Sequence, residues 1–267
     1  MGMRRGWLAL ILMLAGCSNA GPSEPSWATL AARADEAGLW TASVTALLVV
    51  PGNLTPRITP EQTAIDAAGA AWDPFSPNDC VFAQADGPTV TYRLDDCSGS
   101  FGLVHATGHL AVTYQEAGST HTQFHASSTD LVLNGGPVTF EADASVVYDS
   151  DMGVRTIDLS VDTHGVGPEG TMFSRHGTQT ARWTDTWGCL FVDTSHDALT
   201  MVDGIDWQMQ ANQLSLCVGE CPLAGGSITL SGTEGVLTLE YAGANMVAWS
   251  VADQPSESGS MAISCQD

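Results

Sequence analysis

The stretch Val138-Thr-Phe-Glu-Ala-Asp-Ala-Ser-Val-Val-Tyr-Asp149 alternates side chains that prefer a core with side chains that prefer water. Apolar or small residues stand at every even position from 138 to 148, and nearly all the residues between them are polar. The segment from Ile157 to His164 repeats the same period. Period-two alternation is typical of antiparallel strands with one buried face and one wet face. We therefore predict β-structure through this part of the chain.

Turn-forming residues separate these segments at regular intervals. They include Asn134-Gly135-Gly136, Asp149 to Gly153, Gly225-Gly226 and Gly243. Several of the predicted strands are longer than ten residues, whereas the usual length is about 5–6. Long strands in sequence order predict an all-β fold, mainly an antiparallel meander, which curls into a sandwich or a curved open barrel.

The region before Cys80 has a different pattern, which predicts one or two short N-terminal helices. The alanine-rich segment 27–37 predicts a helix that stops at Gly38, and residues 39–50 are predicted to form a strand. Thr59-Pro60-Glu61-Gln62 has the composition of a helix N-terminus, with an N-cap, an early proline and a capping-box glutamine. That second helix is expected to end near Trp72. Residues 27–267 are expected to form a single domain, because no second boundary is visible.

Six cysteines lie within this domain, and an even number indicates three disulfides if the protein is exported to an oxidising compartment. A hairpin that sets Ala83 against Leu94 brings the first two cysteines opposite each other, so they are predicted to pair. For the other four, closure of the short Cys217–Cys221 segment would leave Cys189 to pair with Cys265. A zinc site is disfavoured because there is no second closely spaced cysteine pair. The six disulfide cysteines are Cys80, Cys97, Cys189, Cys217, Cys221 and Cys265.

Histidines gather on two neighbouring predicted strands. A three-residue loop at 116–118 would set His109 opposite His125 and place Asp143 diagonally near His125, after one bulge at 127–129. Such a cluster can hold a transition metal. The favoured interpretation is nevertheless a solvated sheet face, so no metal or other cofactor is predicted. The acidic segment 149–153 is likewise interpreted as a hairpin tip and not as a calcium loop.

The N-terminus carries two arginines, an apolar run and the sequence Leu14-Ala15-Gly16-Cys17. The run is too short to span a bilayer, which needs about 20 apolar residues. This junction resembles the lipobox of bacterial lipoproteins. The resemblance implies that residues 1–16 are a cleaved signal peptide, that Cys17 becomes lipidated and acylated, and that residues 17–26 are a flexible tether. Ser18 stands where the retention signal of enteric bacteria has aspartate, which implies transport to the outer membrane of the cell envelope.

The C-terminal third carries a second resemblance. Cys217-x-x-x-Cys221-Pro222, Gly225-Gly226-Ser-Ile-Thr-Leu and a final strand that ends at Cys265 are similar to the tail of uncharacterised β-rich surface lipoproteins of GC-rich bacteria. This resemblance supports the fold class. It transfers no activity.

The net charge and the absence of known catalytic motifs limit the functions that this sequence can be expected to have. The formal net charge of −22 becomes −24 once Arg4 and Arg5 leave with the signal peptide, and this charge disfavours nucleic acids and anionic lipid headgroups as partners. The sequence contains no nucleophile elbow, no zinc-protease motif and no phosphate-binding glycine loop. We therefore predict a non-enzymatic, lipid-anchored envelope or surface protein that acts as a binding or structural module.

Two alternatives stay open. A curved sheet around the 60–72 helix could form an apolar cleft that carries hydrophobic ligands, or two converging carboxylates could serve a secreted hydrolase of glycan or lipid. The tryptophans of the β-rich part are compatible with core packing or with an exposed stacking surface. These tryptophans are Trp183, Trp187, Trp207 and Trp249.

Overall fold

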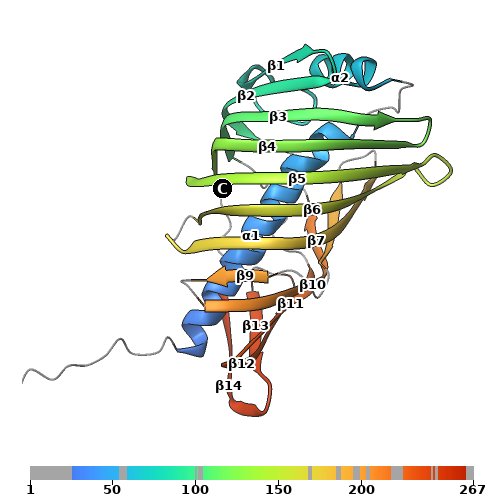
Figure 1. The fold of residues 1–267 in the computed structure, drawn as a ribbon. Helices are drawn as coiled ribbons and strands as arrows, with labels where there is room; N and C mark the ends of the chain where they lie inside the picture. The colour runs from blue at the N-terminus through green and yellow to red at the C-terminus, as the bar shows by residue number, and fades with distance from the viewer. Residues whose placement is uncertain are drawn as a thin grey trace, which may run out of the picture.

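The computed structural model describes residues 26–53, 59–99, 101, 105–167, 170–184, 188–194, 199–202, 205–217, 225–241, 243 and 246–262. In this part of the chain the strands form one 14-stranded sheet in which every pair of neighbours is antiparallel (Figure 1). The strands are β1 Val81–Asp86, β2 Thr89–Ser98, β3 His105–Ala117, β4 His121–Leu133, β5 Gly136–Asp149, β6 Val154–Val166, β7 Met172–Thr184, β8 Cys189–Thr194, β9 Leu199–Val202, β10 Ile205–Cys217, β11 Gly225–Gly232, β12 Gly235–Tyr241, β13 Met246–Val251 and β14 Gln254–Ala262.

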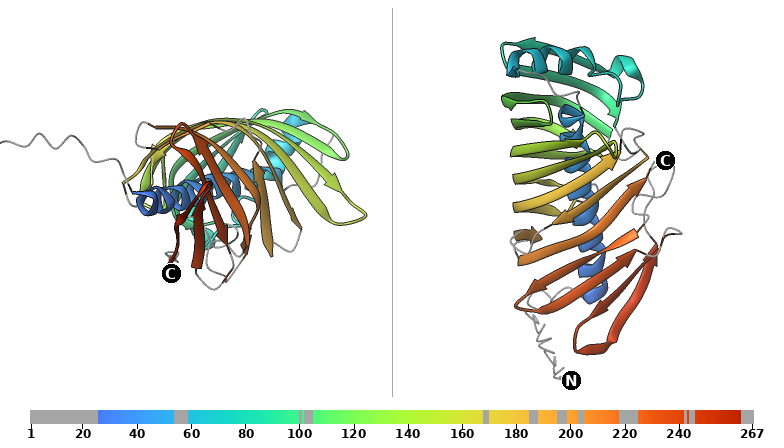
Figure 2. Two further views of the ribbon diagram at one scale, coloured as in Figure 1. Left: turned by 90° about the horizontal axis from the view of Figure 1, so that it is seen from below. Right: turned by 90° about the vertical axis from the view of Figure 1, so that its right-hand side faces the viewer.

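The order of the strands in space follows the chain, which confirms the predicted meander. Only β9 leaves the simple path, since it pairs with β7 and β10 beside the shorter β8. The sheet stays open and curls around one long helix, as the end-on view in Figure 2 shows. The mainly antiparallel all-β fold is therefore confirmed in its curved open form.

The enclosed helix, α1, spans Trp27–Gly52, so the predicted stop at Gly38 and the predicted strand 39–50 are both wrong. Every residue from Ala34 to Gly52 except Leu39 is buried. A helix buried on all sides carries an apolar run without helical periodicity, and such a run cannot be told from a buried strand by its pattern. The surrounding sheet, and not local propensity, decides the conformation.

Gly38 continues the helix because it packs directly against the sheet. A Cβ atom at this position would lie 2.1 Å from Cδ1 of Ile228 in β11. The missing side chain therefore lets α1 approach the sheet closely, at the usual cost of about 1 kcal/mol for glycine within a helix.

Hydrogen bonds fasten α1 to strands far apart in the sheet. Near its start, Tyr241 of β12 donates its hydroxyl to Asp35 at 2.8 Å. Near its end, Tyr114 of β3 donates to the carbonyl oxygen of Pro51 at 3.0 Å. The helix thus crosses the sheet obliquely from β12 to β3 (Figure 1) and connects the two ends of the domain.

The second helix, α2 (Pro60–Gly69), begins where the sequence predicts and ends three residues before the predicted Trp72. The Thr59 hydroxyl accepts a hydrogen bond from the backbone N–H of Gln62 at 3.2 Å, which confirms the N-cap. α2 packs against β1, β2 and β3 at the end of the sheet, and the short 3-10 helix η1 (Asn78–Cys80) leads into β1.

The Cys80–Cys97 disulfide is confirmed, although the register of its hairpin differs from the predicted one by two residues. Ala83 pairs with Tyr92 and not with Leu94, because Asp86 pairs with Thr89 and leaves only a two-residue turn. The first residue of that turn, Gly87, has a φ of +57°, as two-residue hairpin turns require at this position.

The second disulfide joins Cys189 to Cys217, so the predicted pairings of Cys217 with Cys221 and of Cys189 with Cys265 are wrong. The reason is the position of β8 beside β10, which sets these two cysteines directly opposite each other. Cys221 and Cys265 lie outside the described residues, as does Cys17.

Asp35 is a buried carboxyl on α1, and its ionisation is expected to weaken the fold. Burial is the main cause that raises its pKa from 3.8 to about 6, the hydrogen bond from Tyr241 opposes this rise, and the charge of Glu36 adds to it. A folded-state pKa above the unfolded value means that stability is highest below pH 4 and is lost as the pH rises through 6. The rise corresponds to roughly 3 kcal/mol.

Asp35→Asn is therefore expected to increase the free energy of unfolding at pH 7.5 by about 2 kcal/mol, because the amide oxygen still accepts from Tyr241 while no charge is buried. Denaturant unfolding of both proteins at several pH values provides the check, and the gain should vanish near pH 4. Asp86→Asn, at an exposed position in β1, is the control and should change little. A gain that does not depend on pH would contradict the assignment.

Candidate functional site

The outer face of the sheet carries the polar residues of the alternating pattern. The strands that bear the histidines on this face pair in a different register from the predicted one. His125 pairs with Thr113 and not with His109. β3 continues to Ala117, the register shifts between Tyr114 and Glu116, and a second shift lies between Thr107 and Ala111. The predicted pairing of His109 with His125 is therefore wrong, because β3 includes Glu116 and Ala117 of the predicted loop.

The next hairpin agrees better with the prediction. The register shift between Ser128 and Leu131 corresponds to the predicted bulge. His125 pairs directly with Asp143, where a diagonal relation was expected, and its Nδ1 lies 2.9 Å from the Asp143 carboxylate. His109 instead meets Asp130 at 2.7 Å, and this hydrogen bond is the main cause that lowers the pKa of Asp130.

The other described histidines on this face also lie beside carboxylates. Each of the six histidines that the structure describes has a ring nitrogen within 4.0 Å of an Asp or Glu oxygen. Within the same residues, no three His, Cys, Asp or Glu side chains are arranged to hold one metal ion. The six described histidines therefore lie on the solvated outer face, each beside a carboxylate.

The acidic hairpin tip forms an Asx turn. The Asp149 carboxylate accepts hydrogen bonds from the backbone N–H groups of Asp151 and Met152 at 3.0 and 3.2 Å. A side chain that closes its own turn in this way explains the sequence of the tip without calcium.

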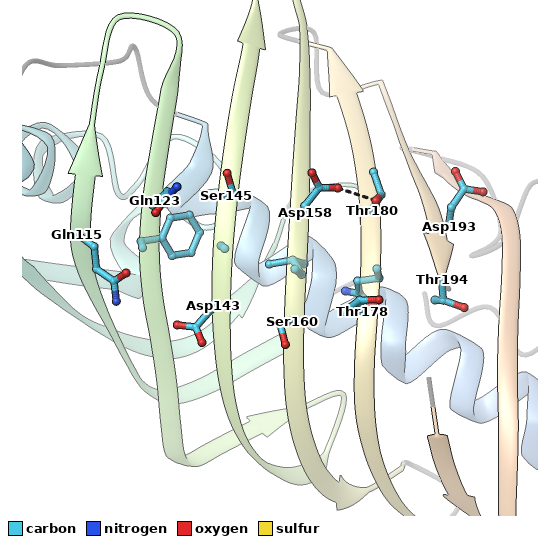
Figure 3. A pocket seen from close by; sticks show the side chains of 14 residues that line it. Gln115, Gln123, Asp143, Ser145, Asp158, Ser160, Thr178, Thr180, Asp193 and Thr194 are labelled. Carbon is cyan, nitrogen blue, oxygen red and sulfur yellow. Dashed lines mark hydrogen bonds between the residues drawn. The ribbon is translucent and has the colours of Figure 1, made fainter. Parts of the chain in front are cut away.

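A broad trough crosses the outer face from Gln115, near the end of β3, over β4 to β8 (Figure 3). Its volume is about 720 Å³, within the range of ligand sites. Thr180 donates to Asp158 at 2.7 Å across two neighbouring strands of the trough. The labelled side chains that line it are Gln115, Gln123, Asp143, Ser145, Asp158, Ser160, Thr178, Thr180, Asp193 and Thr194.

Three carboxylates and several amides and hydroxyls line this trough, and no lysine, arginine or histidine is among its described lining residues. Such a surface offers many acceptors and neutral donors in rows across the strands. It can bind a polar ligand that is neutral or positively charged, and it disfavours an anion.

A second hollow of about 570 Å³ lies farther along the same face, over β8 and β10 to β12. The Phe191 ring, 42% exposed, forms part of its wall together with Gln213 and Glu240. The two hollows are linked at β8, because Asp193 of the trough accepts a hydrogen bond from the backbone N–H of Gln213 at 2.7 Å.

Among the described residues, α1 occupies the concave side of the sheet, and both hollows lie on the outer face. Trp183 and Trp207 are core residues, 1% exposed, while Trp249 is partly buried and Trp187 lies outside the described residues. The helix that the sheet encloses is α1 and not the 60–72 helix of the carrier alternative. Neither helix in the described part of the chain is long and apolar enough to cross a membrane.

Of the trough residues, only Asp143 stood out in the sequence, as a possible metal ligand near His125, and the others did not. Their only signal was the polar half of the period-two alternation, which every solvated strand face shares. Comparison with known proteins adds no candidate, since no protein-family model, no curated protein and no solved structure matches this chain.

Proposed function

We propose that this protein is a lipid-anchored module of the bacterial cell envelope that binds a polar, extended ligand along the outer face of its sheet. The observation that carries the proposal is the trough across β4 to β8, which combines ligand-site volume with a lining of hydrogen-bonding side chains. The lipobox-like sequence at Cys17 supports the anchor.

The position of α1 supports an orientation for the module. Gly235 of β12 lies against Trp27 at the start of the helix, with 3.2 Å between the ring and the site of a Cβ atom on this glycine. A tether of residues 18–26 extends at most roughly 30 Å. The β12 end would therefore stay near the membrane, and the trough on β4 to β8 would lie farther out, where it meets envelope material.

Binding is favoured over the two alternatives. The carrier alternative needs an apolar cleft, whereas α1 fills the concave side. The hydrolase alternative needs two converging carboxylates, one of them protonated as the acid. Each carboxylate of the trough instead has a neighbour that favours its ionised form, since Asp143 lies 2.9 Å from His125, Asp158 accepts from Thr180 and Asp193 lies 3.5 Å from Arg182. We accordingly propose no catalytic role.

Ser145→Arg is expected to weaken binding at least tenfold, because the long side chain occupies the middle of the trough. The measurement is retention of the full-length protein, extracted in detergent, on envelope material stripped of lipid. Ser231→Arg is the matched control, since Ser231 is a partly buried residue on the same outer face but outside both hollows. Equal retention of all three proteins would overturn the proposal.

A further inference from the structure

The hollow over β8 and β10 to β12 is built around an irregularity in the sheet. The pairing of β10 with β11 shifts register between Asn212 and Ser215, and Gln213 takes a φ of +49° without being a glycine. Left-handed backbone at a bulky residue is uncommon, and bulges in sheets often redirect side chains next to functional sites.

Neighbouring residues hold this bulge in place. Gly226, with a φ of +98°, faces Gln213 so closely that a Cβ atom would lie 2.4 Å from the Gln213 carbonyl oxygen. On the other side, the Asp193 carboxylate accepts from the Gln213 N–H at 2.7 Å. Because contacts from β11 and from β8 both hold Gln213 in this conformation, the bulge is a defined feature of the sheet. The bulge leaves the amide side chains of Asn212 and Gln213 exposed at the hollow.

The chemistry of the hollow combines one aromatic face with uncharged and acidic hydrogen-bonding groups. Phe191 pairs with Ser215 across β8 and β10, and Ser215 is buried at the base of the hollow. The Glu240 carboxylate completes the lining, and no basic residue is among the described lining residues.

From this combination, and building on the function proposed above, we infer that the hollow is a saccharide subsite, with Phe191 as the stacking platform. The C–H face of a sugar ring is apolar and packs on an aromatic ring, whereas its hydroxyl groups around the edge both donate and accept hydrogen bonds. Asn212, Gln213 and Glu240 supply matching donors and acceptors.

The link to the trough extends the inference to a chain of sugars. Asp193 lines the trough and also accepts a hydrogen bond from Gln213 of the hollow, so the walls of the two spaces are in contact at β8. One sugar ring stacks on Phe191, and the rings that follow lie along the serine, threonine and glutamine rows of the trough. The acidic lining selects neutral or amine-bearing glycans and disfavours acidic ones.

The test compares Phe191→Ala with Phe82→Ala by titration of the full-length protein in detergent. Phe82 is a matched control, because it is also an exposed phenylalanine on a strand, 60% exposed, and it lines neither hollow. The probes are defined hexasaccharides of glucose and of N-acetylglucosamine, with soluble peptidoglycan fragments. Phe191→Ala should weaken binding about tenfold, Phe191→Trp should retain it, and Phe82→Ala should leave it unchanged.

Two results would overturn the inference. Equal affinity of Phe191→Ala and wild type would remove Phe191 as the platform. The second result combines two observations: the wild-type protein binds none of the saccharides, yet it is retained on stripped envelope material and Ser145→Arg is not. That result would exclude saccharides as ligands and leave the proposed function intact. If the wild-type protein bound neither the saccharides nor the stripped envelope material, the proposed function would be wrong as well.

Discussion

Cys17→Ser is expected to move the protein from the membrane fraction to the soluble fraction of the cell envelope almost completely. Serine has no thiol that could carry the diacylglyceryl group implied by the lipobox resemblance. Stable attachment requires two or more acyl chains, so loss of the modification should leave little residual binding. Fractionation followed by intact-mass analysis provides the measurement.

Ser18→Asp is the control for the anchor. By the sorting rule of the lipoproteins that this N-terminus resembles, it should keep the lipid and change only the membrane in which the protein is found. The mature wild-type protein should begin at Cys17 with the added mass of its acyl chains. A product that retains residues 1–16 with a free thiol would contradict both the anchor and the cleavage site.

Arg175→Met is expected to make the protein more stable, by about 1–4 kcal/mol, which is unusual for a core substitution. Arg175 lies on the inner face of β7 and is 1% exposed, and its Nε and Nη2 atoms have no hydrogen-bond partner among the described residues. Burial lowers the pKa of its guanidinium to about 10. Methionine fills similar volume without an uncompensated charge.

Denaturant unfolding at neutral pH measures this gain. Arg182→Met is the matched control, because Arg182 lies on the outer face of the same strand and its side chain is 49% exposed beside Asp193. Exposed ion pairs contribute little, so the control should change stability by less than about 1 kcal/mol. A loss of stability in Arg175→Met would refute the expectation and would show that this guanidinium is compensated in the folded protein.

The period-two alternation was sufficient to predict the antiparallel meander. Residues from Val138 to Val147 alternate as buried and outward-facing in β5, since a strand places successive side chains on opposite faces. The α2 N-cap at Thr59 and the Cys80–Cys97 pair were predicted for similar reasons. Each depends on residues close together in the sequence, where local geometry leaves few choices.

Predictions that depended on the register across a turn were less successful. The hairpin at Gly118 differs from its expected register because bulges lengthen one strand relative to its neighbour, and no sequence pattern places those bulges. The candidate site could not be predicted from the sequence for the same reason. The trough and the Phe191 hollow consist of residues from at least four strands each, and only their register brings them together.

The sequence by itself determined the fold class and the one-sided polarity of the strands, because these follow from the properties of side chains at local spacing. Only the tertiary structure decided that residues 39–50 are helical, that Cys189 joins Cys217 and that Phe191 and Gln213 line the same hollow. The physical reason is that each of these depends on what surrounds the segment. A uniformly apolar run becomes a helix when a curled sheet encloses it, and two cysteines pair when their strands become neighbours.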